Sequence, residues 1–177
     1  MVDFRLEVLE FRGPARWRWV LTGPDDEPVA DHEVRLDPKC WQFAAFTNLL
    51  GYLRWHAAPD RRVEDEARIV AGVGEWIGTE VLGPVAGALY EARPATVRVM
   101  VPPEAEVLVF RPLELGHVRG RPLAVQDVTL VMQPGADGVA AGRAGPAGER
   151  LRVLGLFSLP VGGQPLNLRR ERILVAY

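Results

Sequence analysis

The feature that most constrains the fold is the segment 151–172 (LRVLGLFSLPVGGQPLNLRRER), where an apolar run, a glycine-containing turn and a helical pattern follow one another. The runs 151–157 and 96–101 (TVRVMV) have the length of buried strands. We predict that both strands belong to a partly parallel sheet. A helix is expected over 166–175.

Residues 3–36 alternate between apolar and polar side chains, which is typical of strands with one buried face. The alternating apolar positions are Phe4, Leu6 and Val8; Trp17, Trp19 and Leu21; and Ala30, His32, Val34 and Leu36. Turn-forming glycine and proline separate the three runs. This pattern predicts an antiparallel meander.

Two or three helices are expected next. The first is predicted over 38–57, capped by Asp37 and ended before Pro59. It is apolar over more than half its surface, so we expect it to be central. A second helix, capped by Asp60, is expected to kink at Gly83 and continue to residue 92. Three glycines within it predict close backbone packing, namely Gly72, Gly74 and Gly78.

After residue 94 the pattern changes to strands. Besides 96–101, a strand is predicted over 125–132, whereas 104–110 fits either a strand or a helical turn. Residues 133–150 lack periodicity and are predicted to form a mobile surface loop. The fold class is therefore α/β, with a β-meander and helical lead-in over 1–93 and a mixed sheet over 94–177, or with one compact domain overall.

The composition excludes several functional classes. One cysteine rules out an intramolecular disulfide, and the net charge of −2 does not favour nucleic acid or an anionic membrane. Acidic residues within the first ten positions do not fit a signal peptide. The longest apolar stretch, 153–161, is far shorter than the roughly 20 residues of a spanning helix. We expect a cytoplasmic protein with no cofactor.

The cysteine and the histidines are candidates for a catalytic dyad or a metal site. Cys40 and His56 lie 16 residues apart in the first predicted helix, about 24 Å at 1.5 Å per residue. His32 falls on an apolar strand face, so only His117 is left as a partner for Cys40. The spacing of these residues matches no zinc motif, and a packed cysteine is the favoured interpretation.

The turn after 151–157 contains Gly162 and Gly163, which offer a weak candidate site for an anion at a helix N-terminus. The complete phosphate-loop pattern is absent, and a plain tight connection is favoured. Three arginines follow it and are weak candidates for a partner surface, namely Arg169, Arg170 and Arg172. A solvated helix face is the favoured interpretation of that cluster.

Trp17 and Trp19 share one strand face with Leu21. Aromatic side chains on a sheet can stack against ligands or partners, so both were considered as partner-surface residues. Their shared face with an aliphatic residue favours the alternative, in which they fill the core.

The stretch 110–115 (FRPLEL) resembles the Pro-Trp-Glu-Leu signature of CHAT domains, a caspase-like peptidase family. The matching residues are Pro112, Leu113, Glu114 and Leu115, with Leu113 where the family usually has tryptophan. The order of strands over 94–172 is also similar, and the whole chain resembles the N-terminal region of actinobacterial CHAT-domain proteins. The resemblance implies a caspase-like fold whose catalytic histidine and cysteine lie further downstream.

This resemblance leads to the main functional hypothesis. The chain is expected to be a non-catalytic N-terminal part of a CHAT-type protein, which scaffolds or regulates a downstream peptidase-like domain. Two alternatives stay open: a stand-alone module that binds a protein partner or a second copy of itself, and an enzyme that holds a phosphorylated ligand at Gly162 and Gly163. The chain ends in a predicted helix without a cap, so we expect the natural polypeptide to continue beyond Tyr177.

Overall fold

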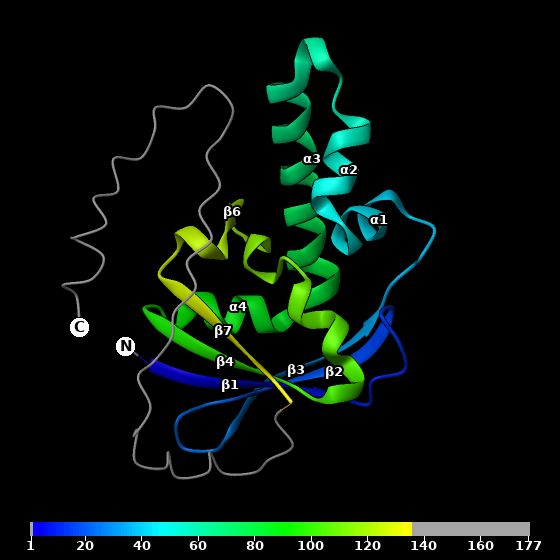
Figure 1. Cartoon of the computed structure of the whole chain (residues 1–177). Coiled ribbons are helices and arrows are strands. Elements are labelled where there is room, and N and C mark those ends of the chain that lie inside the picture. Colours follow the sequence, from blue (N-terminus) through cyan, green and yellow to red (C-terminus); the bar gives the residue numbers. More distant parts are fainter. Residues whose placement is uncertain (1, 136–177) are drawn as a thin grey trace, which may run out of the picture. The chain divides into compact units, whose positions relative to one another are not determined.

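The computed structural model describes residues 2–135, which belong to one compact unit of mixed α/β architecture (Figure 1). The predictions for 151–157, 160–165 and 166–175 lie outside the described residues, as does most of the predicted loop. The strands are β1 (Val2–Leu9), β2 (Arg16–Thr22), β3 (Pro28–Arg35), β4 (Ala95–Val101), β5 (His117–Val118), β6 (Arg121–Pro122) and β7 (Val128–Pro134). The helices are α1 (Trp41–Thr47), α2 (Leu49–His56), α3 (Arg62–Trp76) and α4 (Pro84–Glu91), with a π-helix η2 (Ile77–Leu82) and short 3₁₀ segments η1 (Pro59–Arg61), η3 (Pro103–Phe110), η4 (Leu113–Leu115) and η5 (Leu123–Val125).

A mixed sheet forms the base of the unit, in the order β3-β2-β1-β4-β7. The first three strands pair antiparallel, which confirms the predicted meander. β4 pairs parallel with both β1 and β7, which confirms the strand predicted over 96–101 and the partly parallel sheet. The strand predicted over 125–132 exists as β7 but begins three residues later, because Val125 belongs to η5. Strands from both sides of residue 93 therefore lie in one sheet, while β5 and β6 form a separate two-stranded hairpin.

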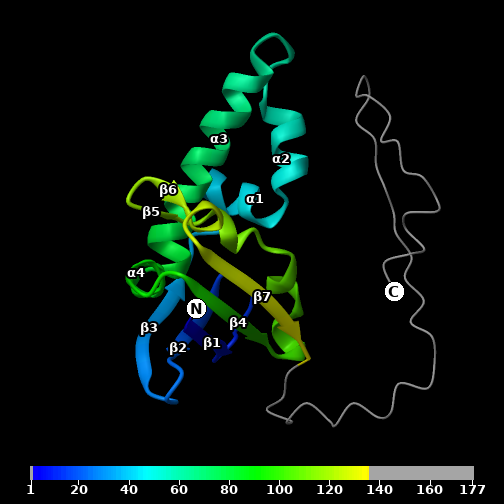
Figure 2. The same cartoon turned by 90° about the vertical axis from the view of Figure 1, so that its left-hand side faces the viewer.

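The two faces of the large sheet differ. In Figures 1 and 2 the described helices all lie on one side of it. Leu6, Trp19 and Val97 point to that side and are fully buried. The other face carries exposed ion pairs such as Arg18–Asp31, whose closest atoms are 2.7 Å apart. Parallel sheets are usually covered on both faces, so one-sided cover over residues 2–135 is more typical of antiparallel sheets.

The helix predicted over 38–57 is wrong in two respects. It is interrupted at Asn48, whose side chain accepts a hydrogen bond from the Gly51 amide and thereby caps a separate helix, α2. Its second half is also peripheral, because α2 has no buried residue and Leu50 and Trp55 are each 81% exposed, whereas α1 places Ala45 and Phe46 in the core. The predicted cap by Asp37 is wrong as well, since α1 is capped by Cys40.

The next helical segment follows the prediction more closely. α3 begins after Arg61, so Asp60 lies in the preceding 3₁₀ turn and does not cap it. The helix widens into η2 and restarts at Pro84, where the kink was expected. A Cβ atom on Gly78 would lie 2.1 Å from the His117 carbonyl oxygen, and one on Gly74 would lie 2.6 Å from the His117 ring. The predicted close packing is confirmed at these glycines.

The end of the π-helix is joined to the sheet by two hydrogen bonds. Trp19 Nε1 donates to the carbonyl of Val81 at 2.9 Å, and His32 Nε2 lies 2.9 Å from the carbonyl of Glu80. Pro84 has no N–H with which to bond the Glu80 carbonyl four residues earlier. Because a carbonyl only accepts, His32 carries hydrogen on Nε2. Side chains of the meander thus cap a helix end that its own backbone leaves unsatisfied.

The segment left open at 104–110 is a 3₁₀ helix, η3, which follows β4 directly. Among the described residues, no helix is long and apolar enough to cross a membrane.

Candidate functional site

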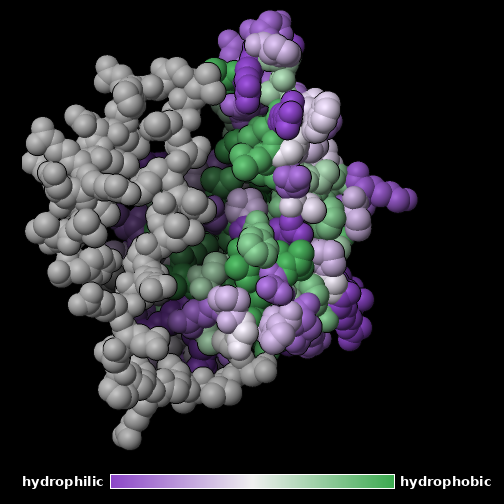
Figure 3. Space-filling view, viewed as in Figure 1, coloured by the Kyte–Doolittle hydropathy of each residue, from purple (hydrophilic) through white to green (hydrophobic). Residues whose placement is uncertain are grey.

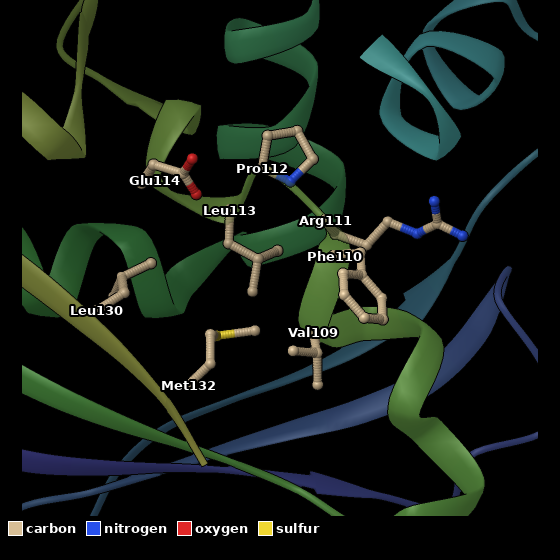
Figure 4. Close-up of a pocket in the computed structure, with 8 residues that line it drawn as sticks. All are labelled: Val109, Phe110, Arg111, Pro112, Leu113, Glu114, Leu130 and Met132. Atoms are coloured by element: carbon tan, nitrogen blue, oxygen red, sulfur yellow. The ribbon is translucent and has the colours of Figure 1, made fainter. Parts of the chain in front are cut away.

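A cavity of about 300 Å³, here called the edge cavity, separates β7 from the η3–η4 segment (Figure 4). Leu130 and Met132 form its floor and stand on the helix-covered face of the sheet, beside Val97 and Val99 of β4. The two β4 valines are fully buried, whereas Leu130 and Met132 are only partly buried. The cavity is lined by Val109, Phe110, Arg111, Pro112, Leu113, Glu114, Leu130 and Met132.

The edge cavity is open because β7 is the last strand of the described sheet. Phe110 stands at its rim and is 78% exposed, which is unusual for a large aromatic side chain beside other apolar groups. Figure 3 shows hydrophobic surface over the middle of this side of the molecule. Within residues 2–135 the site is therefore an apolar groove beside the outer edge of β7, which has no further strand paired to it there. This combination suits polypeptide better than a small polar substrate.

The segment 109–114 forms one wall of this cavity. Leu113 is 1% exposed and points toward the sheet, while the neighbouring Glu114 is exposed at the end of the wall away from Phe110 (Figure 4). The turn is closed by hydrogen bonds from the Leu115 amide to the Pro112 carbonyl and from the Gly116 amide to the Leu113 carbonyl, at 3.1 and 3.0 Å. The aliphatic residue at 113 thus anchors the segment in the core.

Arg111 connects the same segment to the helices. Its guanidinium donates to the backbone carbonyl of Thr47 at the end of α1 and lies 5.6 Å from the centroid of the Phe46 ring. Burial lowers the pKa of Arg111, because removal from water disfavours the charged form. A carbonyl at a helix C-terminus partly compensates that charge. Arg111 was not recognised as important from the sequence, although its place before the signature proline was visible.

Trp17 and Trp19 belong to the core, being 1% and 0% exposed. Their rings meet edge to face, with centroids 5.9 Å apart. The hypothesis that they form a partner-binding face is corrected, because neither ring has a surface that a partner could contact. The alternation that placed them beside Leu21 identified the core correctly.

The cysteine and histidines have separate structural roles. Cys40 Sγ accepts a hydrogen bond from the Phe43 amide as the α1 cap, and His56 stacks on Tyr52 at 4.0 Å between ring centroids. His117 packs against the glycines of α3 and η2, with a buried Nδ1 that has no hydrogen-bond partner within residues 2–135. No hydrogen bond joins Cys40 to a histidine in this part of the chain. The described residues also contain no cluster of three or more potential metal ligands.

Five further candidates cannot be placed. Gly162, Gly163, Arg169, Arg170 and Arg172 lie outside the described residues.

Comparison with known proteins adds no assignment. Neither a protein-family model, nor a curated protein, nor a solved structure matches this chain.

Proposed function

We propose that this chain is a non-catalytic scaffold at the N-terminal side of a CHAT-type protein, and that the edge cavity and β7 receive the peptidase-like part of the same polypeptide. The observation that carries the proposal is the juxtaposition of three features: the outer edge of β7, which pairs with no second strand within residues 2–135, a half-covered apolar cavity, and the exposed Phe110. The CHAT-like signature forms the wall of that cavity. The proposal includes a cytoplasmic location, in keeping with a single cysteine.

The expected occupant is polypeptide because the groove offers both kinds of contact that strand addition uses. The outer edge of β7 presents backbone N–H and C=O groups, and the cavity beside it accepts apolar side chains. A domain that follows in the same polypeptide is available at high effective concentration, so modest contacts suffice to hold it there.

The test uses the polypeptide encoded after the codon for Tyr177, expressed as a separate protein and titrated into this chain by calorimetry. Phe110→Ser should weaken binding at least about ten-fold, since a truncated aromatic anchor commonly costs that much. Trp55→Ser is the matched control, because Trp55 is an equally exposed aromatic on α2. Equal affinity of the two variants, or no binding by the unchanged chain, would contradict the proposal.

Two further measurements separate the alternatives. The chain alone should not cleave a peptide library, so cleavage that disappears in Cys40→Ala would overturn the non-catalytic assignment. Light scattering distinguishes the stand-alone module, because a dimer that Phe110→Ser dissociates would show that a second copy occupies the cavity.

A further inference from the structure

A second cavity, of about 360 Å³, lies where α4 ends and where β4 and β7 begin, and we call it the arginine cavity. It is independent of the edge cavity and of the function proposed above. Its lining comes from three separate stretches of the chain, which are brought together only by the fold. The lining residues are Tyr90, Arg93, Arg119, Arg121, Val125, Gln126 and Asp127.

Two of the arginines are held in place by a tight hairpin. Arg119 and Gly120 form the turn between β5 and β6, with φ angles of 51° and 76°. The side chain of Gln126 is nearly buried and donates through Nε2 to the carbonyls of Val118 and Arg121, at 3.2 and 2.7 Å. A buried amide thus fixes the hairpin before any ligand arrives, which reduces the entropy lost on binding.

The ring of Tyr90, at the end of α4, contacts the guanidinium groups of Arg93 and Arg119. The guanidinium carbon of Arg93 lies 3.4 Å from the centroid of the Tyr90 ring, and that of Arg119 lies 4.7 Å from it. A hydrogen bond from Arg93, together with the charges of Arg93 and Arg119, lowers the pKa of Tyr90. The charges of Arg93 and Arg119 thus act on this ring more strongly than the opposing charge of Glu91.

The acidic residues nearby do not neutralise the cluster. Among residues 2–135, three arginines face the cavity, against one lining carboxylate, Asp127, and a second carboxylate from Glu91. Glu91 Oε1 lies 3.0 Å from Arg119 Nη2, and both side chains are 70% exposed. An exposed pair of this kind contributes little, so an anionic ligand with several oxygens can replace Glu91.

From this geometry we propose that the arginine cavity binds the phosphate group of a small phosphorylated molecule. Guanidinium groups present paired N–H donors whose spacing matches two phosphate oxygens, and three of them surround one polar space. Tyr90 contacts two of the three, Arg93 and Arg119, through its ring. The volume accommodates a phosphate or pyrophosphate group.

The test titrates the full chain with inorganic phosphate and pyrophosphate, with acetate as the carboxylate comparison, by calorimetry and by amide chemical shifts. Pyrophosphate should bind, and acetate should bind much more weakly. Arg119→Ala and Arg121→Ala should each weaken pyrophosphate binding about ten-fold. Arg119→Lys should recover part of this loss, because it restores the charge without the paired donors.

A charge-matched pair of variants makes the test specific. Glu91→Gln should tighten pyrophosphate binding several-fold, because it removes the carboxylate that competes for Arg119. Glu33→Gln makes the same change of net charge on the far face of the sheet, where Glu33 pairs with Arg35 at 2.7 Å, and should change nothing. Absence of pyrophosphate binding at millimolar concentration, or equal effects of Glu91→Gln and Glu33→Gln, would overturn the proposal. Binding of a phosphopeptide but not of pyrophosphate would show that the ligand is a protein.

Discussion

The two core tryptophans allow the contribution of the hydrogen bond between the sheet and the π-helix to the free energy of unfolding to be measured. They lie on the same strand, β2, and both are buried, but only Trp19 has a partner for its indole N–H. Trp19 Nε1 donates to Val81 O at 2.9 Å, whereas Trp17 Nε1 is buried without a hydrogen-bond partner among residues 2–135. Replacement by phenylalanine removes the same atoms at both positions, so the pair acts as its own control.

The expected difference follows from the state of each polar atom. Trp19→Phe leaves the Val81 carbonyl buried and unpaired, which costs about 1–3 kcal/mol in addition to the lost ring volume. Trp17→Phe loses a similar side-chain volume, but it also removes a buried N–H that has no partner within residues 2–135. Removing that group is favourable and offsets part of the stability lost with the ring volume. We therefore expect Trp19→Phe to lower the free energy of unfolding by about 2 kcal/mol more than Trp17→Phe, which is the middle of that range.

Urea denaturation followed by far-UV circular dichroism is the suitable assay, because the helical signal does not depend on either indole. A difference of that size corresponds to a melting temperature lower by about 4–8 °C for a domain of this length. If the two variants are destabilised equally, the Trp19–Val81 hydrogen bond contributes no net stability and the reasoning is refuted.

Three further perturbations test local features. Gly78→Ala should destabilise the fold by several kcal/mol in urea denaturation, because its Cβ would lie 2.1 Å from a backbone oxygen. Gly87→Ala is the control: its Cβ has open space in α4, so the variant should be more stable by about 0.5–1 kcal/mol, and similar results for both variants would contradict the close packing at Gly78. Cys40→Ser should raise the melting temperature slightly, because a hydroxyl is a better α1 cap than a thiol, and a lower value would argue against the capping role. Hydrogen bonds from the Ala58 amide and, secondly, from Arg68 hold the pKa of Asp65 below its usual range. The stability that this carboxylate contributes is therefore fully present above about pH 3.9, the unfolded value, and is lost as the pH falls through the lowered pKa. Asp65→Asn should therefore be less stable than the unchanged chain at neutral pH and approach it in acid, and a constant gap across pH titrations of stability would exclude this linkage.

The failure at α1–α2 shows where reasoning from periodicity stops. Trp41 and Leu50 belong to an apolar pattern that predicts a buried helix, yet they are 40% and 81% exposed. Periodicity tells which side chains share a face but not whether another element covers that face. The interruption at Asn48 had a local signal, an N-cap residue inside the helical pattern, and could have been predicted.

The sequence alone determined the local elements of the sheet. Alternation over 3–36 identified the meander and its buried face, including both tryptophans, and the apolar runs identified β4 and β7. These predictions succeed because strand geometry imposes a period of two on whichever residues occupy one face. The alternation of apolar and polar residues around Trp17 and Trp19 is therefore enough to predict that both side chains are buried.

Only the tertiary structure decided which distant segments meet. Parallel pairing of β4 with both β1 and β7 places the signature segment beside Leu130 and Met132, and the β5–β6 hairpin brings Arg119 to Tyr90. No local pattern encodes these contacts, because each depends on how chain segments far apart in sequence bury their apolar faces together. Both cavities are therefore products of strand order and not of any motif.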